Sequence, residues 1–374
     1  MHAELVPTRL VTTRPRPVVT DGANALRALA LAALLGGCAS IGPGTVARDR
    51  YDYSDSISES WKRQMLLNIV KLRYLDPPIF VDVGQIVAGY SLETAASLGG
   101  QVSSPHASNF TLGASGKFTD RPTVTYTPLT GNAFVKALMT PLPPAAVFYM
   151  IQSGWPADGI LQAALVSLNG LKNQETSING TNPPDADFLR ALELLRDIQR
   201  SGAVSLRVKE QEGDHPATSI LTFRAANIGA DTVGKIQELR TLLGLSQEAT
   251  EFQLVFSGLA SNDREVAVVT RSILHVMTAI GAQVEVPAED VAEGRATPGL
   301  PAGDGAETRG LVRVHSSLEQ PTDASVTVPY RGHWFWIDDR DLRSKRAFAS
   351  MLLLFTLTDN GERENLPVLT IPAQ

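Results

Sequence analysis

Aromatic, imidazole and carboxylate side chains crowd together between residues 330 and 341. Trp334 and Trp336 stand two positions apart, so in a β-strand both side chains point to the same face. Two tryptophans on one face can stack on a sugar ring, and His333 and Asp338 are residue types that exchange protons during catalysis. These four residues are therefore candidates for glycan contact. The alternative is a strand buried on both faces, with Asp338 capping the following helix.

No catalytic or metal-binding motif accompanies this cluster. The sequence contains no HExxH, CxxC, GxSxG or SxxK motif, which are the patterns of zincins, redox proteins, hydrolases and Ser-Lys enzymes. His315 could approach His333 across a sheet, but their spacing is not that of a metal site. We therefore expect no cofactor, no metal and a non-enzymatic role, with an envelope glycan or peptidoglycan hydrolase as an alternative.

Basic residues follow the cluster on a predicted helix over residues 339–357. They could contact an anionic lipid or peptidoglycan, or they could form a solvated face paired with nearby acids. The four residues are Arg340, Arg343, Lys345 and Arg346.

The single cysteine, Cys38, follows a basic segment and then an apolar run, Ala28–Leu35. The segment Leu35-Gly36-Gly37-Cys38 resembles the lipobox of bacterial lipoproteins. The resemblance implies cleavage before Cys38, transfer of a diacylglyceryl group to its sulfur and acylation of the new amino terminus, typically with palmitate. With one cysteine the chain cannot form an internal disulfide.

The resemblance also implies a location. The residues after Cys38 include no aspartate at the second position, which by analogy with this lipoprotein family favours the outer membrane. Two or more acyl chains make a lasting anchor, because each buried CH2 contributes about 0.8 kcal/mol. We therefore expect a lipoprotein anchored in the outer membrane and facing the periplasm, with another envelope protein or polymer as its partner.

Composition excludes several other classes of protein. The 374 residues are 43% hydrophobic and 19% charged, which is typical of a folded chain with two or three domains. The formal net charge is −6, so we expect no nucleic-acid partner. No apolar run reaches the roughly 18 residues of an ordinary transmembrane helix.

Apolar residues alternate with small or polar ones from Ala88 to Tyr126, interrupted by a polar turn at 103–106, although Asp120 and Pro122 fall on the apolar face near one end. This period of two predicts a long antiparallel β-hairpin with one apolar face. One interpretation packs that face on the protein's own helices. In the other, several subunits each contribute a hairpin to a shared pore, because each arm exceeds the about 9–11 residues of a membrane-spanning strand.

The remaining pattern predicts an α+β fold, with an N-terminal helix, the hairpin and further helices followed by a mixed α/β sheet region. We expect helices at 54–74, within 130–170, and at 185–200, 231–243 and 264–280. The expected divisions are a signal peptide at 1–37, a tether at 38–53, a helix and hairpin domain at 54–200, a small α+β domain at 201–286, a flexible loop at 287–310 and C-terminal strands and helix at 311–374.

These features favour a lipid-anchored, non-enzymatic envelope scaffold or accessory protein. The first alternative is a subunit of an oligomeric outer-membrane export pore built from the 88–126 hairpin. The alternatives differ in oligomeric state, because a lone hairpin leaves unpaired strand edges that hydrocarbon does not tolerate.

Overall fold

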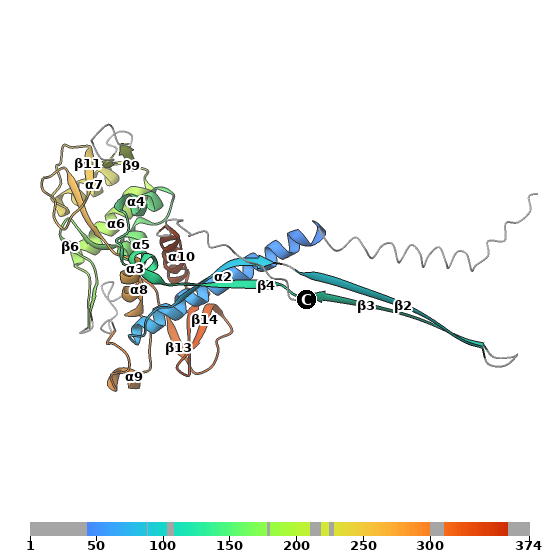
Figure 1. Cartoon of the computed structure of the whole chain (residues 1–374). Coiled ribbons are helices and arrows are strands. Elements are labelled where there is room, and N and C mark those ends of the chain that lie inside the picture. The colour runs from blue at the N-terminus through green and yellow to red at the C-terminus, as the bar shows by residue number, and fades with distance from the viewer. Residues whose placement is uncertain are drawn as a thin grey trace, which may run out of the picture. The chain divides into compact units, whose positions relative to one another are not determined.

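The computed structural model describes residues 43–87, 89–102, 108–177, 180–209, 218–223, 228–299 and 310–357. Helices lie between groups of strands along the chain, and the strands form several separate sheets. This arrangement confirms the α+β class (Figure 1). The chain divides into two compact units, residues 1–56 with 88–122 and residues 57–87 with 123–374. Cys38 and the predicted signal peptide at 1–37 lie outside the described residues.

The first described helix, α2, spans Pro43–Arg73. It begins well before the predicted start at Ser54, so the predicted tether is wrong from residue 43 onward. Proline is tolerated in the first helical turn, where its missing N–H would have no partner, so Pro43 is compatible with a helix start. The second half of α2 buries Met65 and Ile69 completely. The helix stops before Asp76-Pro77-Pro78, as the prolines predict.

Two antiparallel strand pairs follow α2. Phe80–Val87 (β1) pairs with Thr123–Leu129 (β4) in the second unit. Tyr90–Val102 (β2) pairs with Ser108–Asp120 (β3) in the first unit, which confirms the predicted hairpin over residues 90–120. Its predicted continuation to Tyr126 is wrong, because residues 123–126 belong to β4 and pair with β1. The register of β1 and β4 shifts between Val83 and Gln85, so a bulge interrupts the alternation of faces there.

The second unit contains a six-stranded mixed sheet in the order β6-β5-β12-β11-β10-β9. Its strands lie on both sides of residue 200, where two predicted domains meet. Only β11 and β12 are parallel to each other. The strands are β5 (Leu165–Leu168), β6 (Leu171–Lys172), β9 (Val204–Lys209), β10 (Thr218–Phe223), β11 (Glu251–Phe256) and β12 (Glu265–Thr270).

The helix predicted at 264–280 is wrong over its first half, residues 264–272. Glu265–Thr270 forms β12, and the helix α8 spans only Ile273–Gly281. Three of the six β12 residues are valines, and β-branched side chains favour strands. The consecutive residues Val266, Ala267 and Val268 are all buried, so both faces of β12 are covered and its apolar run is continuous rather than alternating.

Helices surround this sheet and largely follow the prediction. Prolines at 141, 144 and 156 divide the segment at 130–170, where helices were predicted, into three helices. A short hairpin of Glu175–Ser177 (β7) and Gly180–Asn182 (β8) precedes α6. The other helices are α3 (Gly131–Met139), α4 (Pro144–Gln152), α5 (Ala157–Ala164), α6 (Ala186–Arg200), α7 (Ala230–Leu242) and α9 (Ala288–Ala292).

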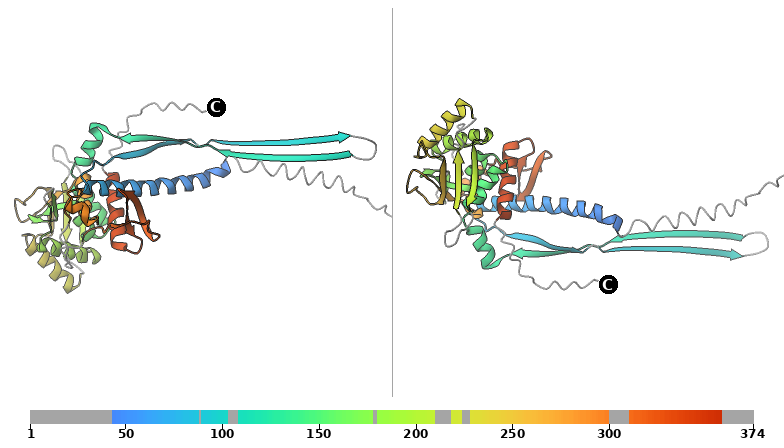
Figure 2. Two further views of the ribbon diagram at one scale, coloured as in Figure 1. Left: turned by 90° about the horizontal axis from the view of Figure 1, so that it is seen from below. Right: turned by 90° about the horizontal axis from the view of Figure 1, so that it is seen from above.

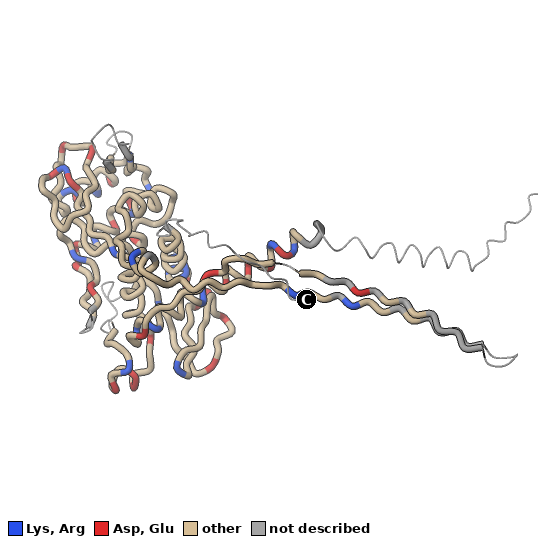
Figure 3. The backbone as a smooth tube through the Cα atoms, in the orientation of Figure 1, with Lys and Arg blue, Asp and Glu red and all other residues tan. Residues whose placement is uncertain are grey.

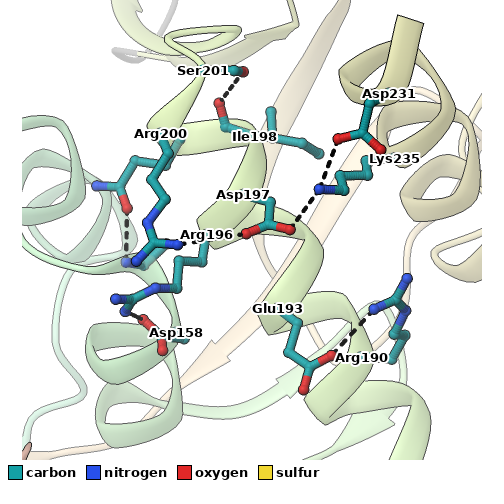
Figure 4. A network of polar contacts seen from close by, with 12 residues as sticks. Asp158, Arg190, Glu193, Arg196, Asp197, Ile198, Arg200, Ser201, Asp231 and Lys235 are labelled. Carbon is teal, nitrogen blue, oxygen red and sulfur yellow. Dashed lines mark hydrogen bonds and ion pairs between the residues drawn. The ribbon is translucent and has the colours of Figure 1, made fainter.

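Ion pairs join α6 to α7. Lys235 of α7 lies 2.8 Å from Asp197 of α6 and 2.9 Å from Asp231 (Figure 4). Arg190 of α6 binds Glu238 of α7 at 2.7 Å. All of these side chains are partly exposed, so the pairs orient the two helices more than they stabilise them.

A three-stranded antiparallel sheet lies near the end of the described chain, in the order β13 (His315–Ser317), β15 (His333–Asp338), β14 (Ala324–Tyr330). Arg331 and Gly332 both have positive φ, as a two-residue hairpin turn of type I′ requires. The helix α10 then spans Leu342–Leu357. Asp341, not Asp338, caps α10, because its carboxylate accepts the backbone N–H of Arg343 and of Ser344.

The flexible loop predicted at 287–310 is partly structured, because α9 occupies residues 288–292. The hydrophobic core belongs to the second unit, where Phe80, Phe188, Phe252 and Phe335 are completely buried. No described side chain from 88–122 belongs to this core. Among the described helices, none is both long and apolar enough to cross a membrane.

Candidate functional site

The β2–β3 hairpin is the most extended feature of the first unit. Its two strands run side by side for 13 residues each, and the ladder runs without a bulge from Tyr90 opposite Asp120 to Val102 opposite Ser108 (Figure 2). At about 3.4 Å per residue, a strand of this length reaches roughly 40 Å. That length is sufficient to cross a membrane even when the strand is tilted.

The register separates the two faces of the hairpin. Leu92 stands opposite Phe118 and Leu98 opposite Leu112, so large apolar residues of both arms occupy positions on one face. Residues on the other face are small or polar, and most of the side chains that the structure describes there are exposed, whereas Thr119 is half-buried. These exposed residues are Glu93, Ala95, Ser97, Ser115 and Lys117.

Both outer edges of the hairpin are open within the described part of the chain, where β2 and β3 form a sheet of two strands. An isolated two-stranded hairpin is at best marginally stable in water. Open edges also present rows of N–H and C=O groups that favour pairing with a further strand. The geometry therefore favours association of this hairpin with other strands or with a surface.

Charge is confined to one end of the hairpin. Glu93 stands directly opposite Lys117, and no Asp, Glu, Lys or Arg occurs between them in residues 94–116. The described part of the hairpin accordingly carries few coloured positions in Figure 3. The uncharged part of β2, Thr94–Val102, matches the about 9–11 residues that a membrane-spanning strand needs.

The charged end of the hairpin contacts the first turns of α2. The Tyr90 hydroxyl donates a hydrogen bond to the carboxylate of Asp49, which also binds Arg48 at 3.1 Å. The hydrogen bond with Asp49 raises the pKa of Arg48. These contacts tie the base of the hairpin to a helix whose first residue, Pro43, follows Cys38 by five positions.

The structure separates His333 from the other three candidate residues of the aromatic cluster. Trp334 and Trp336 are half-buried on one face of β15, and alternation puts His333 on the opposite face. The Trp336 ring lies 4.7 Å from the ring of His315. The Asp338 carboxylate accepts the backbone N–H of Arg340, so it has a structural partner. The described geometry therefore does not join His333 and Asp338 into an acid–base pair beside the tryptophans. The imidazole that lies against Trp336 is that of His315, whose Nδ1 lies 3.0 Å from the Glu285 carboxylate.

A second polar cluster, which the sequence did not indicate, joins the end of α2 to the β14–β15 turn. The Tyr74 hydroxyl donates to the Asp290 carboxylate at 2.6 Å, and Arg295 binds the same carboxylate at 2.6 Å. The guanidinium of Arg331 lies 4.9 Å from the Tyr74 ring centre and 3.1 Å from Asp76. Burial and the contact with Asp290 raise the pKa of Tyr74. Because every charge has a partner, this cluster serves to hold the elements together.

No signal along the sequence could reveal that cluster, since Tyr74 and Asp290 are 216 positions apart. The described residues contain no group of three or more His, Cys, Asp or Glu side chains that could hold a metal ion. Comparison with protein-family models, curated proteins and solved structures finds no significant match to this chain.

Proposed function

We propose that this chain is a subunit of an oligomeric pore in the outer membrane, in which each copy contributes its β2–β3 hairpin to one closed sheet. The observation that carries the proposal is the two-faced hairpin, which has no Asp, Glu, Lys or Arg over residues 94–116 and has both edges open in the described residues. In a ring, β2 of one copy pairs with β3 of the next. This pairing supplies partners for the backbone groups that a single hairpin would leave unpaired in lipid.

The two faces suit such a ring. The face with Leu92 and Leu98 turns to lipid, whereas the face with Ala95, Ser97 and Ser115 lines a water-filled channel. Glu93 and Lys117 then lie at one mouth of the channel, outside the apolar zone. This arrangement accounts for the position of these two charges as well as for the alternation over residues 94–116, whereas Asp120 lies on the other face at the base of the hairpin.

The proposed lipid anchor fits the same membrane position. From Cys38 to Pro43 the chain can reach at most about 18 Å. Acyl chains on Cys38 therefore hold the start of α2 close to the membrane surface, and the Tyr90–Asp49 contact holds the hairpin base near that start. The anchor and the base lie on the periplasmic side, and the hairpin crosses toward the outer surface.

The proposal is tested first on the full-length lipidated protein extracted from membranes in mild detergent. Light scattering is expected to give a discrete oligomer, and the protein is expected to produce stepwise conductance in a planar lipid bilayer. A monomer without conductance would contradict the pore and favour the envelope scaffold. In that case, cross-linking to a second envelope protein becomes the informative measurement.

A pair of neighbouring substitutions tests which face meets lipid. Leu98→Lys introduces a charge on the apolar face, where a lysine near the bilayer midplane costs roughly 2–4 kcal/mol in each copy. We expect Leu98→Lys to abolish conductance. Ser97→Lys introduces the same charge on the other face, and we expect it to retain conductance while shifting selectivity toward anions. Equal loss of conductance in both variants would contradict the assignment of faces.

A further inference from the structure

A pocket of about 280 Å³ opens between α5, α6 and α10 of the second unit. Its lining includes three guanidinium groups, from Arg196 of α6 and from Arg343 and Arg346 of α10. One carboxylate, Asp158 of α5, lies among them. The pocket therefore carries a formal excess of two positive charges.

The arginines of this pocket differ in their partners. Arg196 reaches across to the Asp158 carboxylate and forms an ion pair with it (Figure 4). Arg343 and Arg346 are exposed, and neither has an acidic partner within 4 Å among the described residues. Asp158 therefore neutralises one guanidinium and leaves two free to bind a ligand.

The two neighbouring basic residues near the start of α10 differ from Arg343 and Arg346, because each has an acidic partner. Arg340 binds Asp323 at 2.5 Å, and Lys345 binds Asp339 at 2.5 Å. The expectation of a solvated face paired with acids is therefore correct for these two residues, which do not line the pocket. The same expectation is wrong for Arg343 and Arg346, which line the pocket and have no acidic partner among the described residues.

We propose that this pocket binds a phosphate group, either free or carried by a lipid or glycan. Guanidinium groups present paired N–H donors that match the oxygens of a phosphate. Both free arginines lie in the first turns of α10, and Asp158 and Gly159 lie in the first turn of α5. The positive ends of these two helix dipoles add to the attraction for an anion.

The test is isothermal titration of the full chain in non-ionic detergent with inorganic phosphate. Saturable binding is expected, and the double variant Arg343→Gln/Arg346→Gln is expected to weaken it at least about tenfold, because two charge-assisted hydrogen-bond donors are lost. The matched control Arg340→Gln/Lys345→Gln removes the same charge from the same helix end. Binding in this control should change by less than about threefold, through weak long-range electrostatics alone.

A third variant should act in the opposite direction. Asp158→Asn removes the carboxylate that competes with the ligand for Arg196, so we expect tighter phosphate binding than in the wild type. An increase in affinity cannot be explained by a folding defect. Absence of saturation up to about 10 mM phosphate, a concentration at which even weak binding is visible, would overturn the proposal. Equal weakening in the two double variants would do so too.

Titration with short-chain phosphatidic acid in the same detergent distinguishes the sources of the phosphate. Tighter binding of the lipid than of inorganic phosphate, lost in Arg343→Gln/Arg346→Gln, identifies a headgroup as the ligand. Equal affinities identify the phosphate group alone. The pocket lies wholly within residues 156–350 of the second unit, so the result is independent of the pore proposed for the β2–β3 hairpin.

Discussion

Glu93 of β2 stands directly opposite Lys117 of β3, and the residues between them in sequence carry no other Asp, Glu, Lys or Arg. Both side chains are exposed and belong to the small, polar face of the hairpin. In the proposed ring, every copy therefore adds one negative and one positive charge at the same channel mouth.

This relationship predicts opposite effects of two neutral substitutions. Glu93→Gln leaves the lysines in excess and should shift ion selectivity toward anions, whereas Lys117→Gln should shift it toward cations. Stability should change by less than about 1 kcal/mol, because an exposed cross-strand ion pair contributes little. The measurement is the reversal potential across a bilayer with unequal salt on its two sides. Shifts of the same sign in both variants would contradict the channel-facing assignment.

Anchoring through Cys38 gives a prediction about membrane attachment. Cys38→Ser removes the sulfur that accepts the diacylglyceryl group in the proposed lipoprotein, so the precursor should stay uncleaved and unlabelled by radioactive palmitate. The measurement is gel mobility together with palmitate incorporation. Ser40→Ala, two residues downstream, provides the control and should be processed normally. Unchanged labelling of Cys38→Ser would contradict the anchor.

Much of the hairpin could be predicted from sequence because alternation is a local signal. β2 and β3 keep an unbroken register, and their pattern is visible without knowledge of the fold. β1 (Phe80–Val87) was missed since the bulge between Val83 and Gln85 shifts the alternation midway along the strand. β12 was assigned to a helix because both faces of the strand are buried, so its residues are apolar in succession and do not alternate. Which faces are buried depends on the tertiary structure.

The polar sites were less accessible to sequence reasoning. The basic residues of α10 were recognised as a group, but their separation into paired and free residues depends on Asp323 and Asp339, which the sheet and its turns bring close. Arg196 joins Arg343 and Arg346 in one pocket only because α6 and α10 both border it. The tryptophans shared a face as predicted, whereas His333 took the opposite face of β15.

His275 of α8 makes the free energy of unfolding depend on pH in the mildly acidic range. Burial, and secondarily the nearby positive charge of Arg271, lowers the pKa of His275 from 6.5 to about 4, while Glu175 opposes this shift. As the pH falls, His275 of the unfolded chain binds a proton near pH 6.5, whereas His275 of the folded chain binds it only near pH 4. The stabilising contribution is fully present above pH 6.5 and is lost as the pH falls toward 4, by up to about 3 kcal/mol.

Denaturant unfolding at pH 7.5, 6 and 5 measures this effect on the full chain. The variant His275→Gln cannot take up the proton, so its stability should vary less over this range than that of the wild type. Carboxylates with lowered pKa values, such as Asp197 and Glu238, contribute around and below their ordinary values of 3.8 and 4.5. They are present in both proteins, so the difference between wild type and variant reports His275. An unchanged pH dependence in His275→Gln would contradict the role of this histidine.

Two glycines at the helix α7 should respond oppositely to the same substitution. Gly234 is exposed inside the helix, and an added Cβ would meet no atom within 4 Å. Gly244 lies just beyond the helix end with a φ of +66°, where its N–H binds the carbonyl of Thr241 and the Leu245 N–H binds that of Arg240. These two bonds form a Schellman motif, whose left-handed residue is usually glycine.

Gly234→Ala should therefore raise the free energy of unfolding by about 0.8–1 kcal/mol, because alanine loses less backbone entropy than glycine in a helix. Gly244→Ala should lower it by roughly 1–2 kcal/mol, because alanine is strained in the left-handed region. Chemical denaturation of the two variants beside the wild type measures both changes. Stabilisation by both substitutions would mean that the backbone at Gly244 adopts a right-handed conformation in solution, and the helix would then end without this motif.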